Sequence, residues 1–259
     1  MNIKESYSIF ARFYDEYMEH VDYDLWVNFV LGQYNHHHLA GAGKILELAC
    51  GTGNIATRLV KRGFDVEATD LSAEMIEIAK AKPFAAKFKQ ANMLEKLPTD
   101  KYSLVLLLFD SLNYLQDQDD ITLLFNNVSE SLKETGIFIF DVSTEKNCLD
   151  NFDGFLNIDD EDDSFLVHQS FYIAEEMIQQ THLTLFDKTG DSYKRFDEWH
   201  NQKIYMLANI KELISESKLK LLGIYRLAGK EGVPIPDEEQ SDADQCFTRL
   251  YFICGADNA

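Results

Sequence analysis

The stretch Glu47-Leu48-Ala49-Cys50-Gly51-Thr52-Gly53 decides the fold of this chain. An apolar run from Ile45 to Ala49 leads into it, and a helical pattern from about Asn54 to Arg62 follows it. Glycines at such a strand-to-helix turn let the backbone bend sharply and let a ligand lie directly against the main chain. The stretch therefore predicts a tight turn, with or without a ligand, between a buried strand and a helix.

Outward from this turn, short apolar runs alternate with helical patterns. We expect strands at 45–49, 64–69, 84–90, 104–109 and 137–142, and helices at 54–62, 73–80 and 119–133. A helix at about 210–217 and strands at 220–225 and 247–254 resume the pattern later, on either side of an exposed loop at 229–244. Continuous apolar strands alternating with helices are typical of a parallel sheet covered on both faces, with right-handed crossovers.

Two regions depart from this pattern. Before the turn, apolar residues three and four apart predict helices from about Ile9 to Tyr17 and from about Tyr23 to His38. Residues 144–164 are polar and acidic, and we expect the acidic run 159–163 to be a solvated loop. From Phe165 to about Tyr205 aromatic and β-branched residues predict antiparallel strands, with a turn at 188–190.

The composition limits the possible functions. The 259 residues include 24 Lys and Arg against 44 Asp and Glu, a formal net charge of −20. Such a charge argues against an extended nucleic-acid surface and against a basic membrane anchor. No apolar run approaches the ~18 residues of a membrane span, and the first residues lack a signal-peptide pattern. The four cysteines have no zinc spacing, so we expect reduced thiols in a cytoplasmic protein.

Acidic residues around the turn indicate the kind of ligand. Asp70 ends the next strand nineteen positions after Gly51, where its carboxylate can accept both ribose hydroxyls of a nucleoside; such charge-assisted hydrogen bonds are worth ~1.5–3 kcal/mol each. Residues 51–56 also fit the dinucleotide fingerprint, so NAD stays open on the turn alone. Glu47, however, suits a ligand with an ammonium and a sulfonium group better than a pyrophosphate. Asn92-Met93 could meet an adenine ring.

On these residues the chain resembles the class I S-adenosylmethionine-dependent methyltransferases, whose first motif reads acidic-x-Gly/Ala-x-Gly-x-Gly. Alanine stands here in place of the commoner first glycine. The matching positions of the motif are Glu47, Ala49, Gly51 and Gly53. Further matches are the ribose-binding acid Asp70, the apolar adenosine neighbours Leu71 and Met75, and the Asn92-Met93 pair, where many members have Asp followed by an apolar residue.

The resemblance also implies an architecture. Residues 109–114 resemble the segment that borders both cofactor and substrate, and 10–15 resemble the helix that closes over the cofactor in small-molecule members. The implied fold class is α/β, with a Rossmann-like seven-stranded, mostly parallel sheet, helices on both faces, an inserted antiparallel last strand and a small antiparallel β insertion. We expect a helical lid at 1–40, a methyltransferase core at 41–143 and 206–259, and a substrate or lid region at 144–205.

The implied activity is in-line methyl transfer from S-adenosylmethionine to a small molecule that the sequence does not identify. The residues expected to bind the cofactor are Tyr14, Glu47, Ala49, Gly51, Gly53, Asp70, Leu71, Met75, Asn92, Met93, Phe109 and Asn113. On the acceptor side the candidates are Tyr14, Asn113, His168, His182, Tyr193, Trp199, His200 and Arg249, with Tyr14, Asn113 and His200 considered for a catalytic role. We expect no metal, because consecutive helical residues such as 36–38 point about 100° apart.

Other functions stay open at this point. The chain could methylate RNA with the help of a basic partner subunit, use the same glycine turn for NAD as an oxidoreductase, or serve as a regulatory subunit without catalysis. We expect a small-molecule methyl acceptor as the partner, with no membrane and no nucleic acid. Both a monomer and a homodimer fit the sequence.

Overall fold

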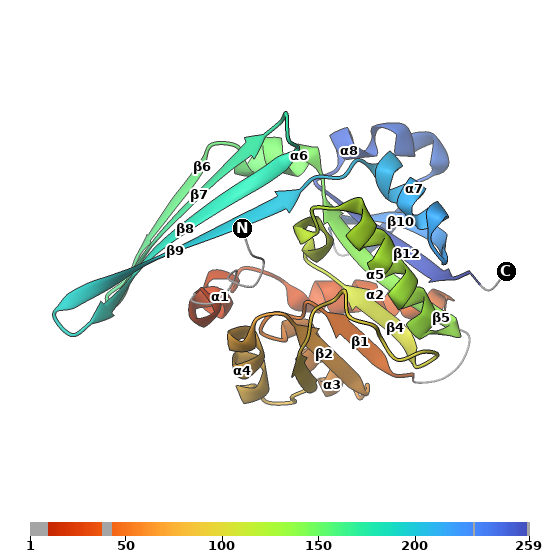
Figure 1. Cartoon of the computed structure of the whole chain (residues 1–259), viewed down its shortest axis with the longest axis horizontal. Coiled ribbons are helices and arrows are strands. Elements are labelled where there is room, and N and C mark those ends of the chain that lie inside the picture. Colours follow the sequence, from red (N-terminus) through yellow and green to blue (C-terminus); the bar gives the residue numbers. More distant parts are fainter. Residues whose placement is uncertain (1–9, 38–42, 230, 258–259) are drawn as a thin grey trace.

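The structure is a computed structural model that describes residues 10–37, 43–229 and 231–257. Its centre is an eight-stranded sheet in the order β11-β10-β12-β5-β4-β1-β2-β3 (Figure 1). The strands of this sheet are β1 (Ile45–Leu48), β2 (Val66–Asp70), β3 (Lys87–Gln90), β4 (Tyr102–Leu107), β5 (Leu132–Ser143), β10 (Leu219–Ala228), β11 (Glu231–Pro234) and β12 (Arg249–Ala256). Neighbouring strands from β3 to β5 pair in parallel, and β12 lies antiparallel between β5 and β10.

The expected fold class and the inserted antiparallel last strand are thus confirmed. The sheet has one strand more than the seven expected, because part of the predicted loop 229–244 forms β11, η4 (Asp237–Asp242) and α8 (Ala243–Cys246). β11 pairs with the end of β10 and packs against Phe29, whose ring would lie 2.4 Å from a Cβ at Gly232. Only glycine permits this approach, and a four-residue edge strand ending in proline gives little sequence signal.

Helices cover both faces of this sheet (Figure 1). One apolar core joins its strands to α5 (Gln118–Ser131) and α7 (Leu207–Glu216). The other joins them to α2 (Tyr23–His37), α3 (Asn54–Lys61) and α4 (Ala73–Ala81). Cover on both faces explains why all six residues of β4 are buried and why its sequence is continuously apolar from Leu104 to Leu107.

A second sheet has four antiparallel strands in the order β6-β7-β8-β9 and extends away from the main sheet (Figure 1). They are β6 (Phe155–Asp160), β7 (Ser164–Ile173), β8 (Ile178–Thr189) and β9 (Ser192–Lys203). Its inner face packs Leu166, Leu183 and Leu185 against Phe10, beside α1 (Ala11–Tyr17). The polar segment α6 (Glu145–Asn147) and the π-helix η3 (Cys148–Phe152) connect β5 to this sheet.

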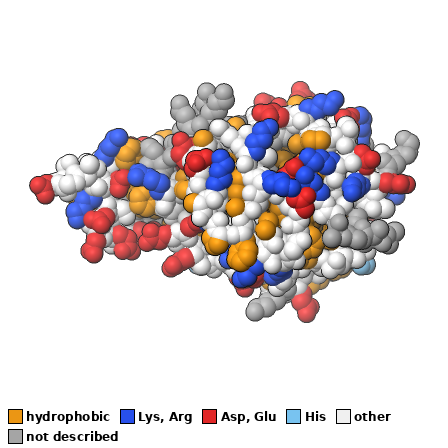
Figure 2. Space-filling view, turned by 90° about the horizontal axis from the view of Figure 1, so that it is seen from below, with side chains coloured by type: hydrophobic (Ala, Val, Ile, Leu, Met, Phe, Trp, Pro, Cys, Tyr) orange, Lys and Arg blue, Asp and Glu red, His pale blue; other side chains and the backbone are white. Residues whose placement is uncertain are grey.

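The acidic run 159–163 is not wholly the solvated loop that we expected. Asp159 and Asp160 end β6, where they pair with Leu166 and Phe165 of β7. Backbone pairing with an apolar neighbour therefore outweighs the low strand propensity of aspartate at this edge. Only 161–163 form the connection to β7, and Figure 2 shows acidic side chains gathered on the narrow end of the molecule.

Two further observations concern only the described part of the chain. None of its helices is long and apolar enough to cross a membrane. It contains no group of three or more His, Cys, Asp or Glu side chains placed to hold a metal ion. His36 and His37 end α2, whereas His38 of the same run lies outside the described residues.

Candidate functional site

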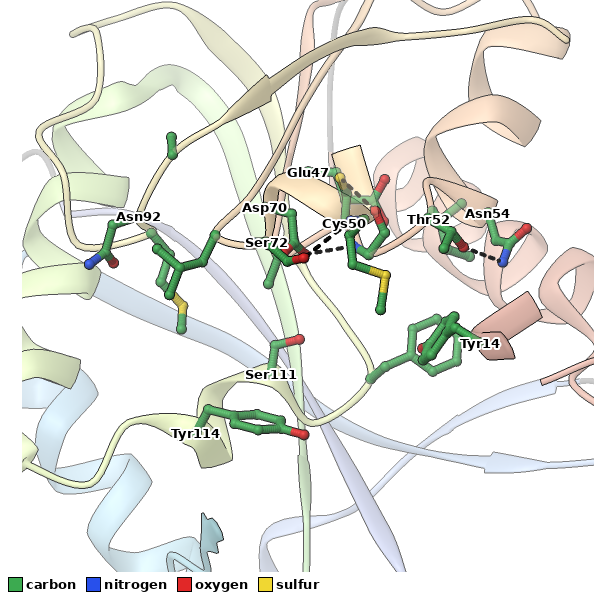
Figure 3. A pocket seen from close by; sticks show the side chains of 18 of the residues that line it. Tyr14, Glu47, Cys50, Thr52, Asn54, Asp70, Ser72, Asn92, Ser111 and Tyr114 are labelled. Atoms are coloured by element: carbon green, nitrogen blue, oxygen red, sulfur yellow. Dashed lines mark hydrogen bonds between the residues drawn. The ribbon is translucent and has the colours of Figure 1, made fainter. Parts of the chain in front are cut away.

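A cavity of about 370 Å³ lies at the carboxyl ends of β1, β2 and β4 (Figure 3). This is where open α/β sheets bind their ligands. Ten of the twelve residues expected to contact the cofactor line it: Tyr14, Glu47, Ala49, Gly51, Asp70, Leu71, Met75, Asn92, Met93 and Phe109. In Figure 3 the glycine turn and Asp70 bound one side of the pocket, while Tyr14, Ser111 and Tyr114 face them from the other side.

The structure does not bring the other two residues, Gly53 and Asn113, to this cavity. Gly53 has φ 76°, and a Cβ there would lie 2.5 Å from the ring of Phe88, so this glycine permits packing behind the turn. Asn113 is fully buried: its amide donates to the carbonyl oxygen of Lys203 at 2.7 Å and accepts from the N–H of Ser143 at 3.0 Å. The side-chain amide of Asn113 therefore bridges the backbone of β5 and the backbone of β9.

Backbone geometry holds the turn open. Gly51 has φ 54° and Ala49, which is not a glycine, has φ 49°. Phe109 and Asp110, after β4, also lie in this left-handed region at 58° and 49°. A non-glycine residue in this region costs on the order of 1–2 kcal/mol, and such strain tends to gather at ligand sites. Three of the six non-glycine residues with positive φ in the described part of the chain thus lie at the two turns that border the cavity.

Asp70 is fixed by the main chain at the end of β2. One carboxylate oxygen accepts the N–H of Gly51 at 2.8 Å, and the other accepts the N–H of Ser72 at 2.9 Å. Burial raises the pKa of Asp70, and these backbone hydrogen bonds oppose the rise. The carboxylate is therefore positioned on the cavity wall before any ligand arrives.

Glu47 is a buried acid with unused hydrogen-bonding capacity. Its side chain is 3% exposed, and its Oε2 has no hydrogen-bond partner in the structure. Burial raises the pKa of Glu47 to about 8, the N–H of Ala56 lowers it, and the negative charge of Asp70 raises it further. An orphaned buried carboxyl oxygen is costly unless a ligand satisfies it, and a cationic ammonium group would do so.

The N-terminal helix α1 is fastened to the glycine turn through Asp15. One oxygen of Asp15 accepts from the Thr52 hydroxyl at 2.6 Å and from the Asn54 amide at 2.9 Å. The other lies 2.6 Å from the ammonium nitrogen of Lys82. These contacts hold α1 beside the glycine turn, with Tyr14 at the cavity wall, where we expected a helical lid.

A second cavity, of about 590 Å³, adjoins the first. Tyr14, Phe109 and Tyr114 line both cavities. The remaining wall comes mainly from α1, from η3 and from the inner face of the four-stranded sheet, together with Trp26, Asp110 and Arg249. The two cavities are therefore neighbours separated by three aromatic side chains.

The acceptor-side candidates divide between this cavity and distant positions. Tyr14, His168, His200 and Arg249 line the second cavity. His182 and Trp199 do not: they stack on each other at 3.9 Å, from the strand positions that alternate with the lining residues Thr181 and His200. Tyr193 lies at the start of β9 and is 54% exposed.

Arg249 belongs to an ionic cluster at the wall of this cavity. Its guanidinium lies 2.7 Å from Asp110 and forms an ion pair with Asp141. Burial raises the pKa of Asp141 to about 6, against the positive charge of Arg249. Asp110 also accepts a hydrogen bond from Gln202 of β9. One ionic cluster, in which Asp141 is fully buried and Arg249 and Asp110 are partly buried, thus connects β5, β12, the turn after β4 and the second sheet.

Sequence reasoning missed Glu198 and Gln202 as residues of the site region, and it included Tyr114 only as part of the 109–114 segment. Tyr114 belongs to the 109–114 segment that resembles a substrate border, and it ends the short 3-10 helix η2 (Ser111–Tyr114). Glu198, His200 and Gln202 are spaced by two on β9 and so share one face of the strand. That alternation was the available signal, but it does not reveal which face is inward.

The fold and the first cavity define a Rossmann-like protein that binds a nucleoside with a cationic group. A family model described as a methyltransferase domain matches residues 45–136. The "Putative methyltransferase YqeM" of Bacillus subtilis (strain 168) is 34% identical over 219 residues, covering 83% of this chain and 87% of the relative. A relative of the same description from Geobacillus sp. (strain WCH70) is 35% identical over 256 residues, covering 96% and 98%.

Among solved structures, an S-adenosylmethionine-dependent methyltransferase from Clostridium acetobutylicum is 25% identical and has a TM-score of 0.78. That similarity covers 96% of this chain and 98% of the other. The chain belongs to the class I S-adenosylmethionine-dependent methyltransferase family, and S-adenosylmethionine is its cofactor.

Proposed function

We propose that this chain transfers the methyl group of S-adenosylmethionine to a small molecule bound in the second cavity. The observation that carries the proposal is the adjacency of the two cavities across Tyr14, Phe109 and Tyr114. A methyl donor in the first cavity and an acceptor in the second would meet at this boundary. The free cysteines agree with a cytoplasmic setting, which is part of the proposal.

The residues of the first cavity fit the cofactor group by group. Glu47, with its orphaned oxygen, would bind the ammonium group, and Asp70 would accept the ribose hydroxyls. Leu71, Met75 and Met93 supply apolar surface for the adenine ring. Asn92 lies at the edge, where its side-chain oxygen already accepts the N–H of Leu94 at 3.0 Å; a carbonyl oxygen has a second lone pair for a ligand.

The bound cofactor supplies an electrophilic methyl group on a sulfonium. The chain's own contribution is to hold the acceptor in line with that group and to exclude water. Orientation of this kind can supply about 7–11 kcal/mol of the barrier reduction. The three shared aromatic side chains and α1 form the boundary at which this alignment would be set.

Binding measurements test the cofactor site. By calorimetry we expect micromolar affinity for S-adenosylmethionine and S-adenosylhomocysteine and none for NAD. Asp70→Ala and Glu47→Ala should each weaken binding about 10- to 150-fold, because each removes contacts worth about 1.5–3 kcal/mol. Asp163→Ala, at an exposed position, is the matched control and should bind as the unsubstituted chain does. NAD binding without binding of either sulfur nucleoside would contradict the proposal.

A labelling experiment tests the acceptor class. The protein is incubated with methyl-tritiated S-adenosylmethionine and with size-separated fractions of a Bacillus subtilis extract. We expect label in the fraction below about 1 kDa, since a cavity of about 590 Å³ holds a small molecule. Label in the RNA fraction instead, with salt-sensitive RNA binding, would favour the RNA methyltransferase that works with a partner.

A further inference from the structure

Three side chains form a line from the boundary of the two cavities into the four-stranded sheet. Tyr114 lines both cavities, and its hydroxyl oxygen lies 3.2 Å from Nδ1 of His200. Nε2 of the same ring lies 3.7 Å from Oε2 of Glu198. Figure 3 shows Tyr114 on the side of the first cavity opposite Asp70. The line therefore begins at the boundary between the two cavities, where the methyl group would pass from donor to acceptor.

Glu198 is the carboxylate that lies beside Nε2 of His200, at 3.7 Å. The two side chains are 6% and 4% exposed, so their interaction is little screened by water. The other oxygen of Glu198 accepts the N–H of Phe10 at 3.0 Å, which holds the carboxylate in place. A carboxylate near Nε2 favours a proton there and leaves the Nδ1 lone pair directed at Tyr114.

His168 lines the same cavity but has a different environment. Its Nδ1 contacts the Tyr17 hydroxyl, and its Nε2 lies 3.1 Å from the Ser170 hydroxyl, which contacts Thr181 at 2.6 Å. Burial lowers the pKa of His168 to about 4, and the nearby His200 adds to the effect. Both ring nitrogens of His168 thus belong to a network inside the sheet, and His200 is the histidine connected to the boundary.

We propose that His200 is the general base of the methyl transfer, acting through Tyr114, with Glu198 as its positioning residue. The inference rests on the proposed function and requires an acceptor with an N–H or O–H group. The acceptor's lone pair forms the bond to the methyl carbon, and the carbon–sulfur bond breaks with its electron pair left on sulfur. The acceptor's proton passes to the Tyr114 oxygen while the Tyr114 proton passes to Nδ1.

The surroundings of His200 can hold the resulting positive charge. Glu198 on the same strand is its carboxylate partner, Tyr114 faces it from η2, and His168 faces it from β7. The other charged groups of the cavity, Asp110 and Arg249, pair with each other. The imidazolium would release its proton to solvent after the methylated product leaves.

Nitrogen NMR of the imidazole rings tests the proposed protonation without any acceptor. The chain has seven histidines, and His200→Gln would assign the His200 signal in protein labelled with ¹⁵N-histidine. At neutral pH, with and without S-adenosylhomocysteine, we expect the proton of His200 on Nε2. Tyr114→Phe should shift the Nδ1 resonance, and Glu198→Gln should increase the population with the proton on Nδ1. A proton on Nδ1 in the unsubstituted chain would overturn the proposal.

Methylation rates test the catalytic role, with the low-mass extract fraction as the acceptor source. We expect His200→Gln to lower the rate about 100-fold or more, with unchanged affinity for S-adenosylhomocysteine and partial rescue by added imidazole. Tyr114→Phe should also lower the rate, and it keeps the ring that packs at the boundary. His182→Gln, which alters a histidine beyond the cavity lining, is the matched control.

The outcomes separate the two proposals. An unchanged rate in His200→Gln, or an equal loss in His182→Gln, would overturn the role of His200. If the unsubstituted chain methylates nothing in the fraction, the proposed small-molecule function fails, while the NMR result still decides the protonation of His200.

Discussion

The two sheets of this molecule show opposite burial patterns, and each builds a different kind of site. Every residue of β4 is buried, whereas buried and partly exposed residues alternate along β7. The first sheet has helices on both faces and places a short glycine turn and two acids, Glu47 and Asp70, near its strand ends. The second presents one face to α1 and builds a cavity from residues between Phe10 and Arg249. The first cavity is therefore lined by residues between Tyr14 and Leu115, most of them at strand ends, whereas the second depends on pairing between segments as distant as Phe10 and Arg249.

The largest effect is expected where the two regions meet, at Arg249. Arg249→Met leaves Asp141, which is fully buried, and Asp110 without their cation. Loss of one partner of a buried ion pair costs about 3–5 kcal/mol, which urea unfolding would measure. Arg195→Met, which breaks an exposed pair with Asp197 on the second sheet, should leave the midpoint nearly unchanged. Equal losses of unfolding free energy in both variants would show that the Arg249 cluster stabilises the fold no more than an exposed ion pair does.

An intermediate effect on stability is expected from substituting one of two glycines that both have positive φ. Gly53 and Gly190 have φ of 76° and 63°, but a Cβ would meet Phe88 at 2.5 Å only at the first, and nothing within 4 Å at the second. Gly53→Ala should therefore cost about 3 kcal/mol from overpacking and strain, and Gly190→Ala about 1 kcal/mol from strain alone. Thermal unfolding compares the two, and equal shifts would contradict the difference in packing.

The smallest effects are opposite dependences of stability on pH. Burial raises the pKa of Glu47 from 4.5 to about 8, so the folded chain keeps a proton that the unfolded chain loses, and stability falls as pH rises from 4.5 to 8. Burial lowers the pKa of His168 from 6.5 to about 4, so stability falls as pH drops from 6.5 to 4.

Substitutions should remove each of these dependences separately. Glu47→Gln should flatten the alkaline loss between pH 6 and 8, and His168→Asn the acid loss between pH 6 and 4.5, each on the order of 2 kcal/mol over that interval. Denaturant unfolding at pH 4.5, 6 and 8 would measure both variants. Unfolding curves that keep the same pH dependence after substitution would show that other groups cause it.

Features set by neighbouring residues could be predicted from the sequence. Ser72 caps the N-terminus of α4 by accepting the N–H of Met75 at 3.1 Å, and Gly63 follows α3 with φ 92°. Caps and turns of this kind depend on a few adjacent residues. The placement of Glu47 and Asp70 beside Gly51 follows from the parallel pairing of two neighbouring strands.

Features set by distant contacts could not be predicted in this way. Asn113 was assigned to the cofactor because of its neighbours, but its amide bonds to Lys203, ninety residues away. His200 reaches Tyr114 across 86 residues, and nothing in the local pattern of β9 specifies that partner. The register of antiparallel strands decides such contacts, and a shift of one residue would reverse the face on which each side chain lies.

The position of α1 has a consequence for the order of events in a catalytic cycle. Tyr14 borders both cavities, Asp15 fastens the helix to the glycine turn, and Arg12 pairs with Asp187 of β8 at 2.9 Å. A single helix therefore bounds both compartments, so opening it for one ligand also loosens the wall around the other. Exchange of the spent nucleoside and departure of the product would then share one slow movement, and the residence time of one ligand would depend on the presence of the other.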